Sequence, residues 1–468
     1  MIEVSFENRD KYSGEELSCQ QLLAGKPLLA IKPKDFCQYP GLLEEKSKTF
    51  GRNSFVSSPR IQFTFFNAPT LCPRTQVFFL DQKLDHFNST DRRTFAQRYK
   101  AFVRLDSNWV FLEIGGESQM KGNSCLAGFG RFSYFNLEHR FYGESVPPGP
   151  LRESITLLNS RQAVADLRSF IQAMNNRYRW RHPKWLVYGC SYAGALAAWL
   201  RQKHPEIIVG AVAGSAPLQA IFDYSEFLES VLNTMRAFDK NGFKAFEKLE
   251  SEYQSLTNVA EGFENISSSP FETDSPLPPK ECAVSPVIDN AVRAVLNGHL
   301  KQFFETIKNV SAAEFLSKLD SKDSGKLEED KQHEFWMHQR CTEFGFWQTK
   351  NSRVVRQRLR NTAALTLKCY IRQCEEFYHS IGLPDFYSAE KNIIGIDDTN
   401  ALFGGNTNYT GSNVIFLNSE QDPWHTLSIL EPPNDEVHTF LSAGHAHCHF
   451  AEEHVRAYQT VAKKWLEK

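Results

Sequence analysis

The turn between residues 185 and 200 constrains the fold of this chain more than any other segment. An apolar run at 185–188 predicts a strand, and the apolar residues at 195–200 predict a helix that ends before Pro205. The hexapeptide Gly-Cys-Ser-Tyr-Ala-Gly, residues 189–194, lies between the two. So short a connection must turn sharply and needs small residues on both sides of Ser191, a need that Gly189 and Ala193 meet. We therefore expect Ser191 at the carboxyl edge of a sheet, beside the N-terminus of a helix.

The rest of the chain repeats this alternation of strands and helices. Further strands are predicted at 109–114, 132–137, 207–213 and 414–417, and further helices after Ser160 and from about residue 451. Ser160 is the expected N-cap of its helix. Residues from about 225 to 335 show helical and polar stretches instead. Because such alternation is typical of a parallel sheet covered by helices, we expect one α/β domain interrupted by a helical insertion.

The composition excludes two classes of protein. The 468 residues include 53 basic and 55 acidic side chains, so the formal net charge is −2. A chain this close to neutrality is not a nucleic-acid binder held by bulk charge. Hydrophobic residues make up 41 % of the sequence, but no run of about 18 uninterrupted apolar residues predicts a membrane span.

A serine on a strand–turn–helix connection is the arrangement of the nucleophile elbow in α/β-hydrolases. There the backbone N–H of Tyr192 would lie at the helix N-terminus and could stabilise an oxyanion. The second donor should follow an earlier strand, and Gly116 N–H, just after the strand at 109–114, is the candidate. The alternative is a small-residue turn with a buried serine hydroxyl. Cys190 is expected to be a buried bystander that faces away from the serine.

The acid and the histidine of this fold follow the serine in the chain, in that order. Asp422 comes just after the strand predicted at 414–417, where an orienting acid belongs. Pro423 favours a fixed turn at this point, which would hold the carboxylate in place. Glu420 is the competing acid.

Three histidines at alternate positions near the C-terminus allow two interpretations. One of His445, His447 and His449 should be the general base, with Nε2 toward Ser191 and Nδ1–H held by Asp422. Alternate residues of an extended chain also share one face, as zinc ligands would. Because no His-Glu-x-x-His motif and no obvious carboxylate partner accompany them, we expect no metal and no cofactor.

Several motifs make the sequence similar to one known family. It resembles the serine exopeptidases that include lysosomal Pro-Xaa carboxypeptidase, dipeptidyl peptidase II and thymus-specific serine protease, and it resembles the thymus-specific branch most. The matching stretches are Leu84-Asp-His-Phe-Asn88, Arg93-Thr-Phe-Ala-Gln-Arg-Tyr99, Ile114-Gly-Gly-Glu117, Leu137-Glu-His-Arg-Phe-Tyr-Gly143, Gly189-Cys-Ser-Tyr-Ala-Gly194, Gly214-Ser-Ala-Pro217, Cys341-Thr-Glu-Phe-Gly-Phe346, Asp422-Pro-Trp424 and Ala446-His-Cys448. Together, in family order, they are far more specific than the elbow alone.

The resemblance implies an α/β-hydrolase with an inserted helical cap and a catalytic triad. Matched motif by motif, the triad is Ser191, Asp422 and His447. The resemblance further implies hydrolysis of short peptides next to proline, and a disulfide between Cys341 and Cys374. Carboxypeptidase, dipeptidyl-peptidase and endopeptidase activity are not distinguished. An esterase of the same fold and a non-catalytic relative that binds peptides remain the alternatives.

The resemblance also divides the chain. Residues 1–75 match nothing in the family, 76–225 would carry the nucleophile, 226–345 the cap, and 346–468 the acid and the histidine. The sequence departs from the family at Cys190, where Gly is usual. It also departs at 118–136, which is shorter than in the family. We predict that this glycine-containing segment lacks a long helix and holds the Gly116 loop weakly.

The expected location follows from sequons and from the resemblance. Asn-x-Ser/Thr sequons, which are candidates for glycosylation, occur at Asn88, Asn265, Asn309 and Asn408. The resemblance implies a secreted or endosomal/lysosomal protein, although residues 1–24 contain seven charged side chains and no apolar core of a signal peptide. As partners we expect peptide substrates, no nucleic acid and no membrane span, and the sequence leaves a homodimer open.

Overall fold

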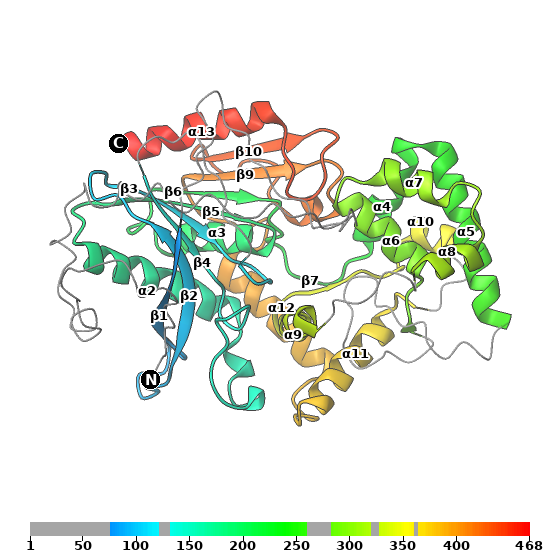
Figure 1. Cartoon of the computed structure of the whole chain (residues 1–468), viewed down its shortest axis with the longest axis horizontal. Helices are drawn as coiled ribbons and strands as arrows, with labels where there is room; N and C mark the ends of the chain where they lie inside the picture. The colour runs from blue at the N-terminus through cyan, green and yellow to red at the C-terminus, as the bar shows by residue number, and fades with distance from the viewer. Residues whose placement is uncertain (1–74, 121–131, 260–281, 320–326, 360–363) are drawn as a thin grey trace, which may run out of the picture. The chain divides into compact units, whose positions relative to one another are not determined.

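A computed structural model describes residues 75–120, 132–259, 282–319, 327–359 and 364–468. An eight-stranded sheet in the order β1-β2-β4-β3-β5-β6-β9-β10 forms its centre (Figure 1). The strands are β1 (Gln76–Lys83), β2 (Thr94–Phe102), β3 (Trp109–Ile114), β4 (Ser133–Leu137), β5 (Lys184–Cys190), β6 (Gly210–Gly214), β9 (Val414–Ser419) and β10 (Val437–Ser442). The sheet strands predicted from apolar runs are all present, β6 starting later than expected.

Strand direction places the carboxyl ends of the central strands at one edge. β1 pairs with β2 and β2 with β4 in antiparallel fashion. From β4 through β3, β5, β6 and β9 to β10, every pair is parallel. This order and these directions confirm the α/β-hydrolase fold, in which residues that follow β3, β5, β6 and β9 meet at the same edge.

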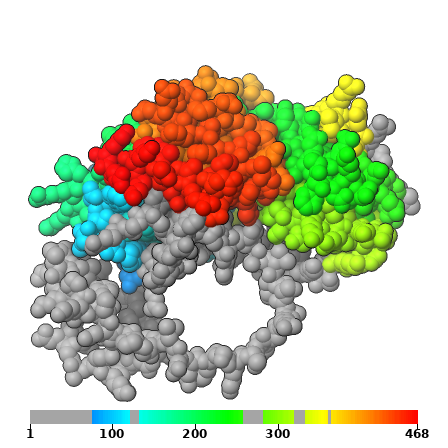
Figure 2. Space-filling model, turned by 90° about the horizontal axis from the view of Figure 1, so that it is seen from above, coloured from blue at the N-terminus to red at the C-terminus, as the bar shows by residue number. Residues whose placement is uncertain are grey.

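Helices cover both faces of the sheet. Along β3, Val110 and Leu112 pack in the core that includes α2 (Ser160–Tyr178) and α3 (Tyr192–Lys203). Phe111 points to the opposite face and packs in the cluster that includes α13 (Glu452–Glu467). Burying one such aromatic side chain contributes roughly 1.5–3 kcal/mol. In the space-filling view, α13 lies on the visible surface (red in Figure 2).

The N-cap of α2 differs from the prediction. Asn159, not Ser160, caps the helix, because the Asn159 side chain accepts a hydrogen bond from the backbone N–H of Gln162. The Ser160 hydroxyl instead donates to Glu343 Oε1 at 2.6 Å. Asn159 and Ser160 are both suitable N-cap residues. A local sequence pattern cannot show that Ser160 bonds to Glu343, which lies 183 residues further along the chain.

Between β6 and β9 the chain leaves the main sheet and forms the helical insertion. Its elements are β7 (Ile221–Asp223), α4 (Ser225–Phe238), α5 (Lys240–Val259), α6 (Pro286–Leu296), α7 (Leu300–Ile307), α8 (Ala312–Leu319), α9 (Leu327–Gln339), η5 (Arg340–Phe344), β8 (Gly345–Trp347), α10 (Arg353–Arg358), α11 (Leu367–Ser380) and α12 (Ala389–Phe403). β7 and β8 pair in a separate parallel two-stranded sheet. Helices are therefore present after residue 225, and they continue to Phe403, while the bounds of 226–345 for the cap stay a prediction.

Two disulfides join elements of the insertion. Cys341 pairs with Cys374, with Cα atoms 5.9 Å apart, and this is the bridge that the resemblance implied. Cys282 pairs with Cys369 and ties the chain before α6 to α11. No helix within the described ranges is long and apolar enough to cross a membrane.

Candidate active site

Ser191 lies between β5 and α3 in a strained backbone conformation. Its φ of 60° and ψ of −135° are unusual for a residue with a Cβ, and such strain persists only where the surroundings enforce it. The Ser191 N–H donates to Gly214 O at 2.9 Å, which fixes the turn against the end of β6. The turn therefore has the backbone of a nucleophile elbow.

Glycine is required on both sides of this serine. A Cβ at Gly189 would overlap Ala193 O and would lie 2.8 Å from Gly194 N. A Cβ at Gly194 would lie 2.7 Å from Gly214 O. Both obstacles are backbone atoms, which cannot rotate away. The small residues predicted from the sharpness of the turn are thus explained by direct backbone contact.

Asp422 follows β9 and is fully buried. Its Oδ2 accepts a hydrogen bond from His447 Nδ1 at 2.8 Å, and its Oδ1 accepts one from Trp424 N–H at 3.0 Å. The competing Glu420 is exposed and accepts a long bond, 3.3 Å, from Gly444 N–H. The buried acid beside a histidine is therefore Asp422.

The three C-terminal histidines have different partners. His447 contacts Asp422, whereas Nδ1 of His445 bonds to Ala443 O at 2.7 Å and Nδ1 of His449 bonds to His447 O at 2.7 Å. The two flanking rings thus hold backbone carbonyls of their own loop. Alternate spacing could not separate these roles, because it places the three residues on one side of an ideal extended chain.

The pKa of His447 is raised from its ordinary value of 6.5. Burial alone would lower this pKa, but the charge of Asp422 and its hydrogen bond outweigh burial, and Glu117 adds to the effect. Its side chain is 18 % exposed. Because Nδ1–H faces the acid, Nε2 is the nitrogen that is left to accept a proton.

A disulfide between Cys190 and Cys448 corrects the prediction for Cys190. This residue is no bystander: the bridge joins the residue before Ser191 to the residue after His447, with Cα atoms 6.0 Å apart. The turn itself gives no sign of this bridge, because the partner of Cys190 lies 258 residues away along the chain. Two cysteines that each adjoin a candidate catalytic residue were the clue in the sequence.

Ser215 is a further residue of the site that sequence reasoning did not single out. Its N–H donates to Leu417 O at 2.7 Å, and its hydroxyl accepts a hydrogen bond from Cys448 N–H at 3.0 Å. Its φ of 44° again lies in the left-handed region. Ser215 therefore links the ends of β6 and β9 to the histidine loop, residues 443–449.

The structure brings the predicted residues together to different degrees. Asp422 and His447 are in direct contact, and the disulfide joins the histidine loop to the Ser191 turn. Among the described residues, Ser191 Oγ makes no hydrogen bond to His447. Such bonds are often loose before substrate binds.

Gly116 lies against the first turn of α3. A Cβ placed on Gly116 would be 3.4 Å from both Cβ and N of Ala193, which places this loop beside the proposed oxyanion donor Tyr192 N–H. Gly115 N–H donates to Leu137 O at 2.8 Å and holds the loop on β4. The prediction that the segment 118–136 lacks a long helix stays a prediction, because its residues 121–131 lie outside the described ranges.

A buried polar network lies behind the elbow. The Tyr192 hydroxyl bonds to His139 Nε2 and accepts from Gln339 Nε2, each at 3.0 Å. Burial lowers the pKa of His139 to about 4, although its bond to Arg140 O opposes the shift. Burial raises the pKa of Glu343 to about 7 against the hydrogen bonds from Ser160 and Gln339. The network thus connects α3 to the helical insertion.

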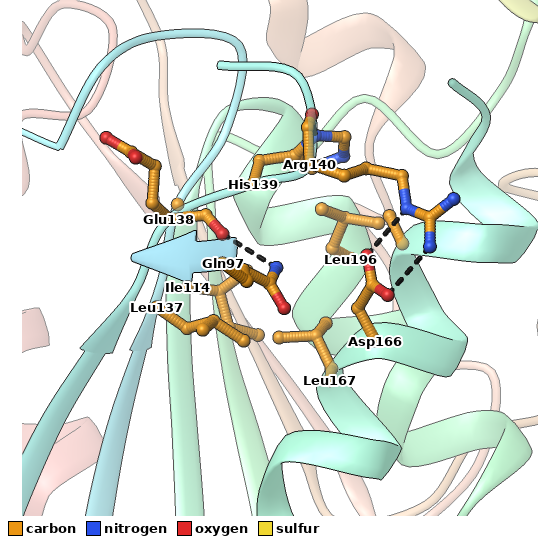
Figure 3. Close-up of a pocket in the computed structure, with 11 residues that line it drawn as sticks. Gln97, Ile114, Leu137, Glu138, His139, Arg140, Asp166, Leu167 and Leu196 are labelled. Atoms are coloured by element: carbon orange, nitrogen blue, oxygen red, sulfur yellow. Dashed lines mark hydrogen bonds and ion pairs between the residues drawn. The ribbon is translucent and has the colours of Figure 1, made fainter. Parts of the chain in front are cut away.

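The Leu-Glu-His-Arg motif serves structure rather than substrate (Figure 3). Arg140 donates to both oxygens of Asp166, at 2.6 and 2.7 Å, and Gln97 Nε2 donates to Glu138 O at 2.8 Å. The cavity among these residues measures about 10 Å³. That volume suits at most one water molecule, so the motif anchors β2, β4 and α2 to one another.

A larger hollow of about 510 Å³ is lined by Gln421, the residue before Asp422, and by none of Ser191, Asp422 and His447. α4 lines one side of it, and Glu420, Gln421 and Thr426 line the other. Three carboxylates, Glu226, Glu229 and Glu420, line this space, and its lining among the described residues includes no basic side chain. A volume of this size accommodates a small peptide segment.

Comparison with known proteins places the site in a family. The profile of the serine carboxypeptidase S28 family matches residues 82–285 and 285–457. The thymus-specific serine protease of Homo sapiens is 30 % identical over 442 residues, which cover 80 % of this chain and 81 % of that protein. The putative serine protease K12H4.7 of Caenorhabditis elegans is 28 % identical over 427 residues, 78 % of this chain and 81 % of that protein.

Two further matches are more limited. The lysosomal Pro-X carboxypeptidase of Mus musculus is 31 % identical over 235 residues, 44 % of this chain and 47 % of that protein. Among solved structures, VinJ aligns over 80 % of this chain and 95 % of that one, at 12 % identity and a TM-score of 0.36, and this distant likeness carries no weight here. The match to the family profile and the 30 % identity to the human relative show that the chain belongs to the serine carboxypeptidase S28 family of serine peptidases.

Proposed function

We propose that this chain hydrolyses short peptides as a serine exopeptidase, with Ser191 as nucleophile, His447 as general base and Asp422 as orienting acid. The observation that carries the proposal is the 2.8 Å hydrogen bond between His447 Nδ1 and buried Asp422, on a loop bridged to the Ser191 turn. This bond fixes the tautomer in which His447 Nε2 can take a proton.

The reaction proceeds through an acyl-enzyme. Ser191 Oγ attacks the peptide carbonyl while His447 accepts its proton, and the imidazolium then protonates the leaving amine. Backbone N–H groups of Tyr192 and Gly116 stabilise the oxyanion, where one donor is worth about 3–4 kcal/mol. Water, activated by His447, then releases the acyl group and regenerates Ser191.

Specificity for proline is supported by an aromatic cluster beside Asp422. Trp424 is half-buried and packs against Phe227 and Phe346, with ring centroids 5.1 and 5.2 Å apart. A flat, partly exposed ring offers an apolar wall to a pyrrolidine ring. The name of the murine relative, lysosomal Pro-X carboxypeptidase, supports the same bond preference.

The acidic hollow between α4 and residues 420–426 bears on the type of exopeptidase. Glu226, Glu229 and Glu420 would attract a free peptide ammonium group and repel a free carboxylate. The hollow therefore favours dipeptidyl-peptidase action, whereas the family's name favours carboxypeptidase action. Peptides with one Xaa-Pro bond, blocked at either end or at neither, distinguish the two.

Location in the secretory pathway is part of the proposal. Three disulfides among the described residues are typical of an oxidising compartment. Asn88, Asn309 and Asn408 are exposed, as glycosylation requires, and Asn265 lies outside the described ranges. A lysosomal relative agrees with a secreted, endosomal or lysosomal location.

Labelling with a fluorophosphonate tests the central claim. The oxidised chain should be labelled at Ser191, and Ser191→Ala should lose the label. Absence of any label would favour a non-catalytic peptide binder. A labelled chain that hydrolyses esters but none of the Xaa-Pro peptides would favour the esterase alternative.

A further inference from the structure

The two loops that carry the proposed nucleophile and base are joined covalently. Cys190 directly precedes Ser191 and Cys448 directly follows His447, and the two cysteines form a disulfide across a sequence separation of 258 residues. Cys190 is the last residue of β5, the rigid central strand, and pairs there with Gly214 of β6. The bridge thus fastens a surface loop to the part of the sheet that holds the nucleophile.

The histidine loop needs such an anchor because its backbone is strained. Cys448 has a φ of 60°, which a residue with a Cβ adopts only when its surroundings hold it there. Besides the bridge, Cys448 is held through its N–H, which donates to Ser215 Oγ. One turn hydrogen bond, from His449 N–H to Ala446 O at 3.1 Å, closes the loop on itself.

We propose that the Cys190–Cys448 disulfide is a positioning element that keeps His447 at Ser191, so that hydrolysis depends on this bridge being oxidised. The inference rests on the proposed function and adds a requirement to it. The two cysteines act through their neighbours and take no part in bond breaking. Without the bridge, the loop keeps its hydrogen bonds to Ser215 Oγ, Gln421 N–H and Ser419 Oγ. It loses its covalent tie to the elbow, so His447 is held less firmly at Ser191 and against Asp422.

Accessibility should make this bridge the first of the three described disulfides to be reduced. Cys190 and Cys448 are half-buried, whereas Cys282, Cys341, Cys369 and Cys374 are at most 6 % exposed. A thiolate of an external dithiol attacks one Sγ and forms a mixed disulfide, and its second thiol then displaces the cysteine. The dithiol leaves as a disulfide, and two electrons and two protons convert the bridge into two thiols.

A matched pair of double variants tests the positioning role. Cys190→Ala with Cys448→Ala should lower kcat by about 10²-fold, the effect of a small misplacement of a catalytic group, while KM changes little. The acidic limb of its pH profile should also shift, because His447 is held less firmly against Asp422. Cys282→Ala with Cys369→Ala also removes one disulfide, and it should lower thermal stability but leave kcat and the pH profile unchanged.

Partial reduction of the unmodified chain gives an independent measurement, also if the first double variant does not fold. The rate of fluorophosphonate labelling at Ser191 should fall in step with reduction of Cys190–Cys448, followed by mass mapping, and should recover on reoxidation. Equal labelling of the oxidised and reduced forms, or wild-type kcat in the first double variant, would overturn this inference alone. An oxidised chain that is never labelled at Ser191 would overturn the proposed function instead.

Discussion

The elbow around Ser191 and the histidine loop around His447 reach their strained backbones by different means. At the elbow, the constraints are local: a Cβ at Gly189 would overlap Ala193, four residues away. At the histidine loop they are distant: Asp422, Ser215 and Cys190 hold it from three other strand ends. A short motif can therefore specify the first but not the second.

This difference divides the site into a rigid half and a dependent half. The elbow is part of β5 and α3, both almost fully buried. The histidine loop lies between β10 and α13, where most residues are only half-buried. Regions with less burial open at lower free energy, so perturbations should reach catalysis mainly through the histidine loop.

The largest effect should come from removing the proposed nucleophile of the rigid half. Ser191→Ala should lower kcat on an Xaa-Pro peptide by roughly 10⁴–10⁶-fold, because the hydroxyl that would form the acyl-enzyme is lost. Far-UV circular dichroism should be unchanged, since alanine fits the elbow. Residual activity within tenfold of wild type would show that the nucleophile is a different residue.

The next effect should come from the dependent half. Asp422→Asn should lower kcat by about 10⁴-fold, because an amide can stabilise the wrong tautomer of His447 and cannot stabilise its imidazolium. Glu420→Gln is the matched control, since Glu420 is exposed and two residues away. A control variant as impaired as Asp422→Asn would mean that the acid has been misassigned.

Two glycine substitutions in the rigid half should have different effects, one mainly on stability and the other mainly on activity. Gly189→Ala should destabilise the chain by about 3 kcal/mol or more, because its Cβ meets backbone that cannot move. In Gly116→Ala the new Cβ would lie 3.4 Å from Cβ and N of Ala193, an ordinary contact. The free energy of unfolding of this variant should therefore change by less than about 1 kcal/mol. Its kcat should nevertheless fall, since the proposed oxyanion donor shifts. Urea unfolding and steady-state kinetics on both variants check this contrast.

The same contrast between the elbow and the histidine loop explains which parts of the site could be predicted from the sequence. Strands β3, β5 and β9 and the elbow could be predicted because their apolar periods and small residues are local. The contact of Asp422 with His447 was expected from chain order together with the family resemblance. Ten cysteines allow many pairings, and the only clue to Cys190 with Cys448 was that each adjoins a candidate catalytic residue, which no local pattern shows. The prediction of Ser160 as the N-cap was wrong for a similar reason, since Ser160 bonds to Glu343 from far along the chain.

The smallest effect, and the one that best separates the two halves, concerns pH. The folded pKa of His447 is raised above 6.5 by Asp422, so protonated His447 is the form that folding favours. Its contribution to stability is therefore fully present below the unfolded pKa of about 6.5, and is lost as pH rises through the folded pKa. Activity should instead rise with pH over this range, because Nε2 accepts a proton only when the ring of His447 is neutral.

The substitution His447→Gln measures the contribution of His447 protonation to the stability of the fold. The free energy of unfolding of wild type minus that of the variant should be largest below about pH 6.5 and should shrink at higher pH, while kcat/KM of wild type rises over the same range. Ser191→Ala is the control, since it leaves the Asp422–His447 pair intact and should keep the wild-type dependence of stability on pH. A difference that grows with pH would mean that burial, and not Asp422, dominates at His447. The histidine loop would then be held by the disulfide and Ser215 without help from the acid.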